Sequence, residues 1–163
     1  MKQISEPDML HRMAAYCSTA ERCIQDVQAK IKAAGLPAEA IARIITQLQK
    51  EKFIDEARFA RSFVNDRLRF NGWGRIKIAY ELNRKNIPPA IRSDALENID
   101  ETTYLNGLMA LLKGKKKTVH GQNEQEVYMK LLRFAVGRGF ESRETNQCLR
   151  QLFKENNYAD DME

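Results

Sequence analysis

The chain has 163 residues, of which 43% are hydrophobic and 30% charged, and its formal net charge is +5. This length and balance are typical of one ordinary globular protein and exclude collagen-like, low-complexity and largely disordered classes. The longest apolar runs fall far short of the ~20 residues that cross a bilayer, and residues 1–13 lack the apolar core of a secretory signal. We therefore expect a cytoplasmic protein with no membrane contact.

The cysteines and histidines limit the chemistry that the chain can perform. Cys17, Cys23 and Cys148 form an odd set without C-x-x-C spacing, which argues against a disulfide framework or a structural zinc site. His11 and His120 lie in neither a HExxH motif nor a nucleophile elbow. Because no Cys, His and carboxylate pattern converges, we expect no metal, no cofactor and no enzymatic activity.

Apolar residues recur at three- and four-residue spacing along most of the chain, whereas period-two alternation is scarce. Val27 and Ile31 begin one such series, and Ile44, Ile45 and Leu48 continue it. Spacing of this kind is typical of helices that bury one face. The sequence therefore predicts an all-α fold.

The helical pattern repeats with a period of about 51 to 53 residues. In this register Gly35, Asn86 and Gly139 are equivalent, and each is followed by a large apolar residue. Gly and Asn tolerate the left-handed conformation that closes a helix, so each marks a helix end. Since three short helices bury little surface alone, we predict three tandem three-helix repeats that stack into an elongated, curved array.

Charge and repeat spacing set the expected boundaries of these parts. We expect an N-terminal segment at residues 1–13 and an acidic, frayed tail at residues 154–163. The three repeats between them are expected at residues 14–55, 56–100 and 101–153. Within the third repeat, residues 113–125 have two glycines, four lysines and no apolar periodicity, so we expect a mobile basic loop there.

The middle repeat begins with a helix that carries an aromatic stripe. Asp55 precedes the periodic stretch and is placed to cap it. At about 100° per residue, Phe59, Phe63 and Phe70 fall on one arc, which predicts that all three are buried. Trp73, in the connection that follows, is expected to wedge against two helices; the alternative is a stacking platform for a nucleobase.

Arg67 lies in the middle of the apolar arc of this helix. A lone charge there is costly unless it is paired, so we predict an internal ion pair, with Glu81 as the partner. Removal of one member of a buried pair costs roughly 3 to 5 kcal/mol.

The basic residues gather in the middle and later parts of the chain. Arg58, Arg61 and Arg69 fall in one narrow sector opposite the aromatic stripe, and this sector is either a solvated face or a partner surface. The surface extends through Arg75 and Lys77. A second cluster, which would attract a polyanion unless it is only a solvated loop, consists of Lys113, Lys115, Lys116 and Lys117.

The middle repeat resembles the RecX family of bacterial regulatory proteins. The similarity begins with FIDEARFA at residues 53–60 and continues through the GWG turn to the helix end RKNI. Residues 130–149 are similar to the third repeat of that family, and with a weaker first repeat the similarity covers roughly residues 14–153. The residues that carry the structural signature are Phe53, Asp55, Phe59, Arg67, Gly72, Trp73, Gly74, Glu81 and Leu82.

The resemblance implies a monomeric, non-enzymatic regulator of the RecA recombinase. RecX proteins bind the RecA filament on single-stranded DNA, lie in its helical groove, and inhibit ATP hydrolysis, strand exchange and coprotease activity. On this basis we expect a RecA partner, with a weak direct DNA contact. The expected contact residues are Arg58, Arg61, Arg69, Arg75, Lys77, Lys113, Lys115, Lys116 and Lys117. The alternative is a basic helical-repeat protein that binds nucleic acid independently of RecA.

Overall fold

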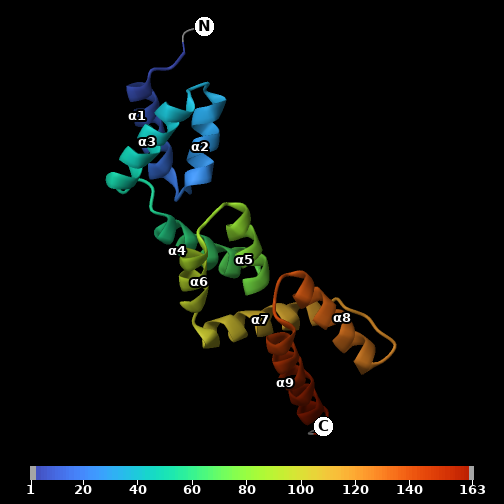
Figure 1. Cartoon of the computed structure of the whole chain (residues 1–163). Helices are drawn as coiled ribbons and strands as arrows, with labels where there is room; N and C mark the ends of the chain where they lie inside the picture. Colours follow the sequence, from blue (N-terminus) through green and yellow to red (C-terminus); the bar gives the residue numbers. More distant parts are fainter. Residues whose placement is uncertain (1–2, 162–163) are drawn as a thin grey trace. The chain divides into compact units, whose positions relative to one another are not determined.

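The computed structural model describes the backbone of residues 3–161 and the side chains of residues 3–154. Every regular element in this part of the chain is helical, which confirms the all-α prediction (Figure 1). None of these helices is both long enough and apolar enough to span a membrane. In chain order the elements are α1(Glu6–Thr19), α2(Ile24–Ala33), α3(Ala38–Lys50), α4(Glu56–Asp66), η1(Arg67–Asn71), α5(Arg75–Arg84), α6(Pro89–Glu97), α7(Glu101–Lys116), α8(Glu124–Gly137) and α9(Ser142–Asp161).

Helix α1 begins inside the segment that the sequence analysis left outside the first repeat. Ser5 caps it, because its side chain accepts a hydrogen bond from the amide of Asp8 at 3.2 Å. Met9 and Met13 lie four residues apart on one face of α1, and both are buried. Helix α1 therefore packs through residues on both sides of residue 14, where the first repeat is predicted to start.

The predicted helix ends are confirmed at all three equivalent positions. Gly35, Asn86 and Gly139 have φ values of 89°, 60° and 92°, which lie in the left-handed region. The apolar residue that follows each is buried; Ile87 and Phe140 also donate amide hydrogen bonds of 3.1 Å back into the preceding helix. These turns set the start of α3, α6 and α9.

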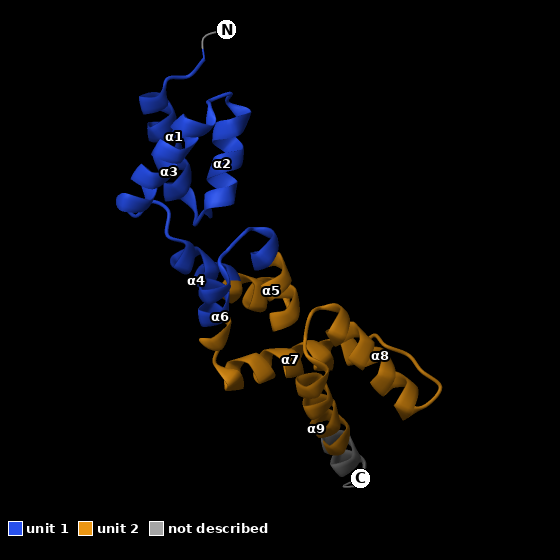
Figure 2. Ribbon diagram, in the orientation of Figure 1, with its two compact units in different colours: residues 1–63, 82–95 blue, residues 64–81, 96–163 orange. Residues whose placement is uncertain are grey.

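The structure divides into two compact units, which are coloured separately in Figure 2. The first unit comprises residues 1–63 and 82–95, and the second comprises residues 64–81 and 96–163. Helices α4, α5 and α6 each contribute residues to both units. The boundaries of the three repeats and their stacking into a curved array stay predictions.

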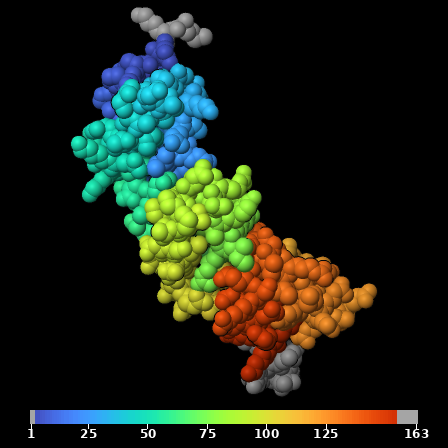
Figure 3. Space-filling view, in the orientation of Figure 1, coloured from blue at the N-terminus to red at the C-terminus, as the bar shows by residue number. Residues whose placement is uncertain are grey.

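In the first unit the core lies among α1, α2 and α3. Figure 3 shows the outer face of these helices, coloured from dark blue to teal. Val27, Ile31 and Leu48 have no exposed surface. The amphipathic spacing seen in the sequence therefore does bury one face of each helix. Burial of a side chain of this size stabilises the fold by roughly 1.5 to 3 kcal/mol.

In the second unit the core lies among α7, α8 and α9 and includes Tyr104, Leu112, Leu131 and Phe140. Helix α7 runs to Lys116 and α8 begins at Glu124, so residues 113–116 of the predicted basic loop 113–125 are helical, while residues 117–123 connect the two helices. Lys is a good helix former, and positive charge near a helix C-terminus is stabilised by the helix dipole.

The C-terminal part of the chain also differs from its prediction. Residues 154–161 continue α9 rather than forming a frayed tail, and residues 162–163 lie outside the described residues.

A π-helical segment, η1, follows α4 and corrects the predicted aromatic arc. Phe59 and Phe63 are buried, with ring centroids 5.8 Å apart, but Phe70 is 74% exposed. The arc assumed 3.6 residues per turn throughout, and the wider π-turn changes the angular position of each later residue. Phe70 is therefore not a core residue.

Candidate interaction surface around the Gly-Trp-Gly turn

The GWG turn, residues 72–74, packs against the turn between α8 and α9. Gly72 ends η1 in the left-handed conformation, with φ at 63°. The amide of Gly74 donates to the Arg138 carbonyl at 2.9 Å, and the amide of Ile76 donates to the Gly139 carbonyl at 3.0 Å. A Cβ on Gly74 would lie 2.4 Å from backbone atoms of Gly139, which no real Cβ tolerates. Only glycine permits this contact.

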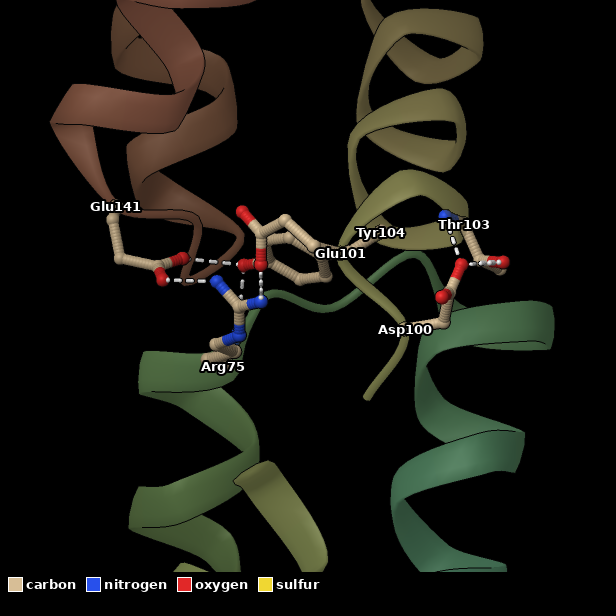
Figure 4. Close-up of polar contacts among 6 residues, drawn as sticks. All are labelled: Arg75, Asp100, Glu101, Thr103, Tyr104 and Glu141. Carbon is tan, nitrogen blue, oxygen red and sulfur yellow. Dashed lines mark hydrogen bonds and ion pairs between the residues drawn. The ribbon is translucent and has the colours of Figure 1, made fainter. Parts of the chain in front are cut away.

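Arg75 follows the turn and is held by acidic residues rather than projecting into solvent. Its guanidinium donates to Glu141 at 2.9 Å and to Glu101, and it lies 3.9 Å from the Tyr104 ring centroid (Figure 4). The Tyr104 hydroxyl accepts from the Arg75 amide at 3.1 Å and donates to Glu141. Arg75 is therefore not the exposed cation that the sequence predicts; it joins the starts of α5, α7 and α9. Its part in partner binding stays a prediction.

The network controls the ionisation of its own members. Burial alone would raise the pKa of Glu141, but hydrogen bonds from Tyr104 and Arg75 hold the pKa below its usual value. Burial and the hydrogen bond to Glu141 raise the pKa of Tyr104. At neutral pH the carboxylate is therefore charged and the phenol neutral, which is the state that this geometry requires.

Trp73 is half-buried, and two cationic side chains lie near its ring. The Lys77 ammonium is 4.6 Å from the indole centroid, and the Arg67 guanidinium is 5.3 Å from it. Arg67 also donates to the Asn71 side chain at 3.1 Å. These contacts place Arg67 and Lys77 on the indole, while the predicted pairing of Arg67 with Glu81 stays a prediction.

The arginines of α4 and η1 have different surroundings. Arg58 binds Glu21 with an Nε to Oε1 distance of 2.5 Å and donates to the Lys52 carbonyl at 2.9 Å, so it fixes the entry to α4 in the first unit. The Arg58 side chain is 38% exposed, and its predicted part in partner binding stays a prediction. Arg61 and Arg69 are exposed as predicted. Asp55 caps α4 as predicted, accepting from the Arg58 amide at 3.0 Å.

The lysine cluster lies on the last turn of α7 and just after it. Lys113 and Lys117 are exposed, whereas Lys115 and Lys116 are half-buried. The Lys115 ammonium lies 4.9 Å from the Phe134 ring centroid, and that of Lys116 lies 4.7 Å from the Phe153 ring centroid. Helix geometry and these aromatic contacts therefore orient the cluster, which a mobile loop would not.

Exposed apolar side chains, which the sequence analysis did not single out, accompany these cations in the second unit. Ile76 and Tyr80 are 58% and 60% exposed and lie four residues apart on α5, on either side of Lys77 in the chain. Their spacing alone could have suggested a shared face. An exposed apolar and cationic face is typical of a protein interaction surface.

The described residues contain no group of three or more His, Cys, Asp or Glu side chains that could hold a metal ion. Burial raises the pKa of the Cys23 thiol to about 11, which disfavours the reactive thiolate. The arrangement around the GWG turn is a rigid, cation-bearing surface.

Comparison with known proteins places the chain in a family. A family model described as "RecX, second three-helix domain" matches residues 55–96, which span α4, η1, α5 and most of α6. The regulatory protein RecX of Prosthecochloris aestuarii is 32% identical over 143 residues, covering 88% of this chain and 92% of the relative. The chain belongs to the RecX family. The relatives that it matches are named regulatory proteins.

Two further RecX proteins extend the comparison. The regulatory protein RecX of Clostridium acetobutylicum is 26% identical over 161 residues, covering 94% of this chain and 74% of the relative. The crystal structure of RecX from Lactobacillus salivarius superposes with a TM-score of 0.82 at 18% identity, covering 90% of this chain and 96% of that one. At this identity the structural likeness shows a shared fold, which agrees with the predicted helical-repeat class.

Proposed function

We propose that this chain binds the RecA recombinase on single-stranded DNA and lowers its ATP hydrolysis, strand exchange and coprotease activity. The observation that carries the proposal is the similarity to a regulatory protein RecX along 88% of the chain. The cationic and apolar side chains around the GWG turn support it, because they supply both electrostatic attraction and a desolvated contact area.

The proposed contact residues divide by their surroundings. Arg61, Arg69, Lys113 and Lys117 are exposed and contact the partner or its DNA directly. Lys77, Lys115 and Lys116, each beside an aromatic ring, add fixed positive charge. Arg58 and Arg75 act indirectly, because their internal ion pairs hold α4 and α5 in position.

Inhibition requires that the chain bind one arrangement of the filament more tightly than another. A ligand shifts an equilibrium only by its difference in affinity for the two states. Binding to an inactive arrangement of RecA protomers would therefore lower ATP turnover without displacing the nucleotide.

The test measures sedimentation of the chain with RecA assembled on single-stranded DNA and, separately, its binding to the same DNA alone over a range of salt. We expect sedimentation with the filament, lost in the variant Arg61→Glu/Arg69→Glu. The control Lys32→Glu/Lys50→Glu changes net charge equally at exposed positions of α2 and α3 and should retain binding.

The alternative function predicts a different pair of results. If about six cations neutralise phosphates of the single-stranded DNA, the logarithm of DNA affinity falls against the logarithm of salt concentration with a slope of about −4. Tight DNA binding with that slope, together with no binding to RecA filaments beyond that to DNA alone, would replace our proposal with a RecA-independent nucleic-acid-binding role.

A further inference from the structure

An apolar groove lies beside η1 and α7 in the second unit. Its volume is about 860 Å³, and its apolar walls include Leu68, Phe70, Leu111 and Phe140. Phe70, which is 74% exposed, leaves a large aromatic surface open to a ligand. A concave, mostly apolar site of this size suits one large apolar side chain and the peptide backbone on either side of it.

The charge of the groove has one sign. Its lining includes two charged residues, Arg69 and Arg138, and no acidic residue. Arg69 is exposed. Arg138 donates one N–H to the Asn71 carbonyl at 2.8 Å, and a guanidinium has five N–H donors, so others can bind a carboxylate.

We infer that this groove docks a peptide segment of a partner protein in which one large apolar side chain is flanked by Asp or Glu residues. The aliphatic walls bury the apolar side chain, and Arg69 and Arg138 bind the flanking carboxylates. A nucleic-acid strand fits less well, because Leu68 and Leu111 offer no hydrogen bonds to a base edge and two arginines match few phosphates.

The inference goes beyond the proposed function, because the groove selects the chemistry of the peptide and not the identity of the protein that carries it. Binding can therefore be measured with peptides in the absence of RecA. Loss of peptide binding would contradict the groove as a docking site, whereas an unchanged rate of ATP hydrolysis by RecA would contradict the proposed function, so the two results can be told apart.

Gly107 provides a way to fill the groove without harming the fold. It lines the groove from α7, and a Cβ added there would meet no atom within 4 Å. Gly114 lies on the same helix with the same open surroundings but does not line the groove. Because Leu favours helices over Gly, both Gly107→Leu and Gly114→Leu should fold at least as stably as the native chain.

The experiment measures fluorescence anisotropy of a labelled peptide that has eight acidic residues around one central phenylalanine. Two control peptides carry a central alanine, or lysines in place of the acidic residues. We expect saturable binding of the first peptide, at least about tenfold weaker binding of the alanine peptide, and no binding of the lysine peptide.

The variants then locate the site. Gly107→Leu and Arg69→Glu should each weaken the phenylalanine peptide at least about tenfold, whereas Gly114→Leu should bind it like the native chain. Equal affinity for the phenylalanine and alanine peptides, or equal affinity of the two glycine variants, would overturn the inference. Oligothymidylate is then added as a competitor for the peptide. If it displaces the peptide equally well from Gly107→Leu and from the native chain, the binding is due to general electrostatic attraction and not to the groove.

Discussion

Substitution of Gly74 by alanine tests whether the GWG turn holds the second unit together. The new Cβ would lie 2.4 Å from three backbone atoms of Gly139 and Phe140, so the two turns must separate. Overpacking of this kind costs about 1 to 3 kcal/mol. Separation also weakens the amide bonds from Gly74 to Arg138 and from Ile76 to Gly139, each with a net value of about 0.5 to 1.5 kcal/mol. We expect a total loss of about 2 to 6 kcal/mol.

The assay is urea unfolding followed by the fluorescence of Trp73, which is the single tryptophan of the chain and lies inside the turn. We expect the midpoint to fall for Gly74→Ala, with an unchanged slope against urea concentration. The control Gly107→Ala, at an open helical position, should gain about 0.5 to 1 kcal/mol. A midpoint for Gly74→Ala equal to that of the native chain would refute the close contact between the two turns.

Two further predictions concern the internal ion pairs. Because the pKa of Glu141 is held below its usual 4.5, its charge stabilises the fold at neutral pH, and this contribution disappears as the pH falls through the lowered pKa. The stability difference between the native chain and Glu141→Gln, from urea unfolding at several pH values, should therefore shrink below about pH 4.5; a constant difference would exclude the pair with Arg75. Arg58→Ala should lower the free energy of unfolding by about 1 to 2 kcal/mol, because it leaves Glu21 unpaired. Arg61→Ala should change it by no more than about 0.5 kcal/mol. Equal shifts of the melting temperature for the two variants would contradict these roles.

The features that the sequence could predict depend on local chemistry. The left-handed helix ends at Gly35, Asn86 and Gly139 follow from backbone sterics, which act within a few residues. The buried stripes follow from helical periodicity for the same reason. The cap at Asp55 needs only the free amides of the next turn.

The features that the sequence analysis missed depend on distant partners or on a break in periodicity. Arg75 and Glu141 are 66 residues apart, so no spacing rule could identify their pairing. Phe70 was placed in the core because a uniform helix was assumed across η1. The loop prediction began four residues early because it took Gly114 as a loop signal, whereas Gly114 lies inside α7 and the connection begins at residue 117.

The rate of ATP hydrolysis by RecA on single-stranded DNA, measured as the chain is added, tests the proposed regulation most directly. We expect the native chain and Lys32→Glu/Lys50→Glu to lower the rate at similar concentrations, and Arg61→Glu/Arg69→Glu to need at least about tenfold more protein. An unchanged rate with the native chain would contradict regulation of RecA. Equal potency of all three proteins would contradict the cationic surface as the site of contact.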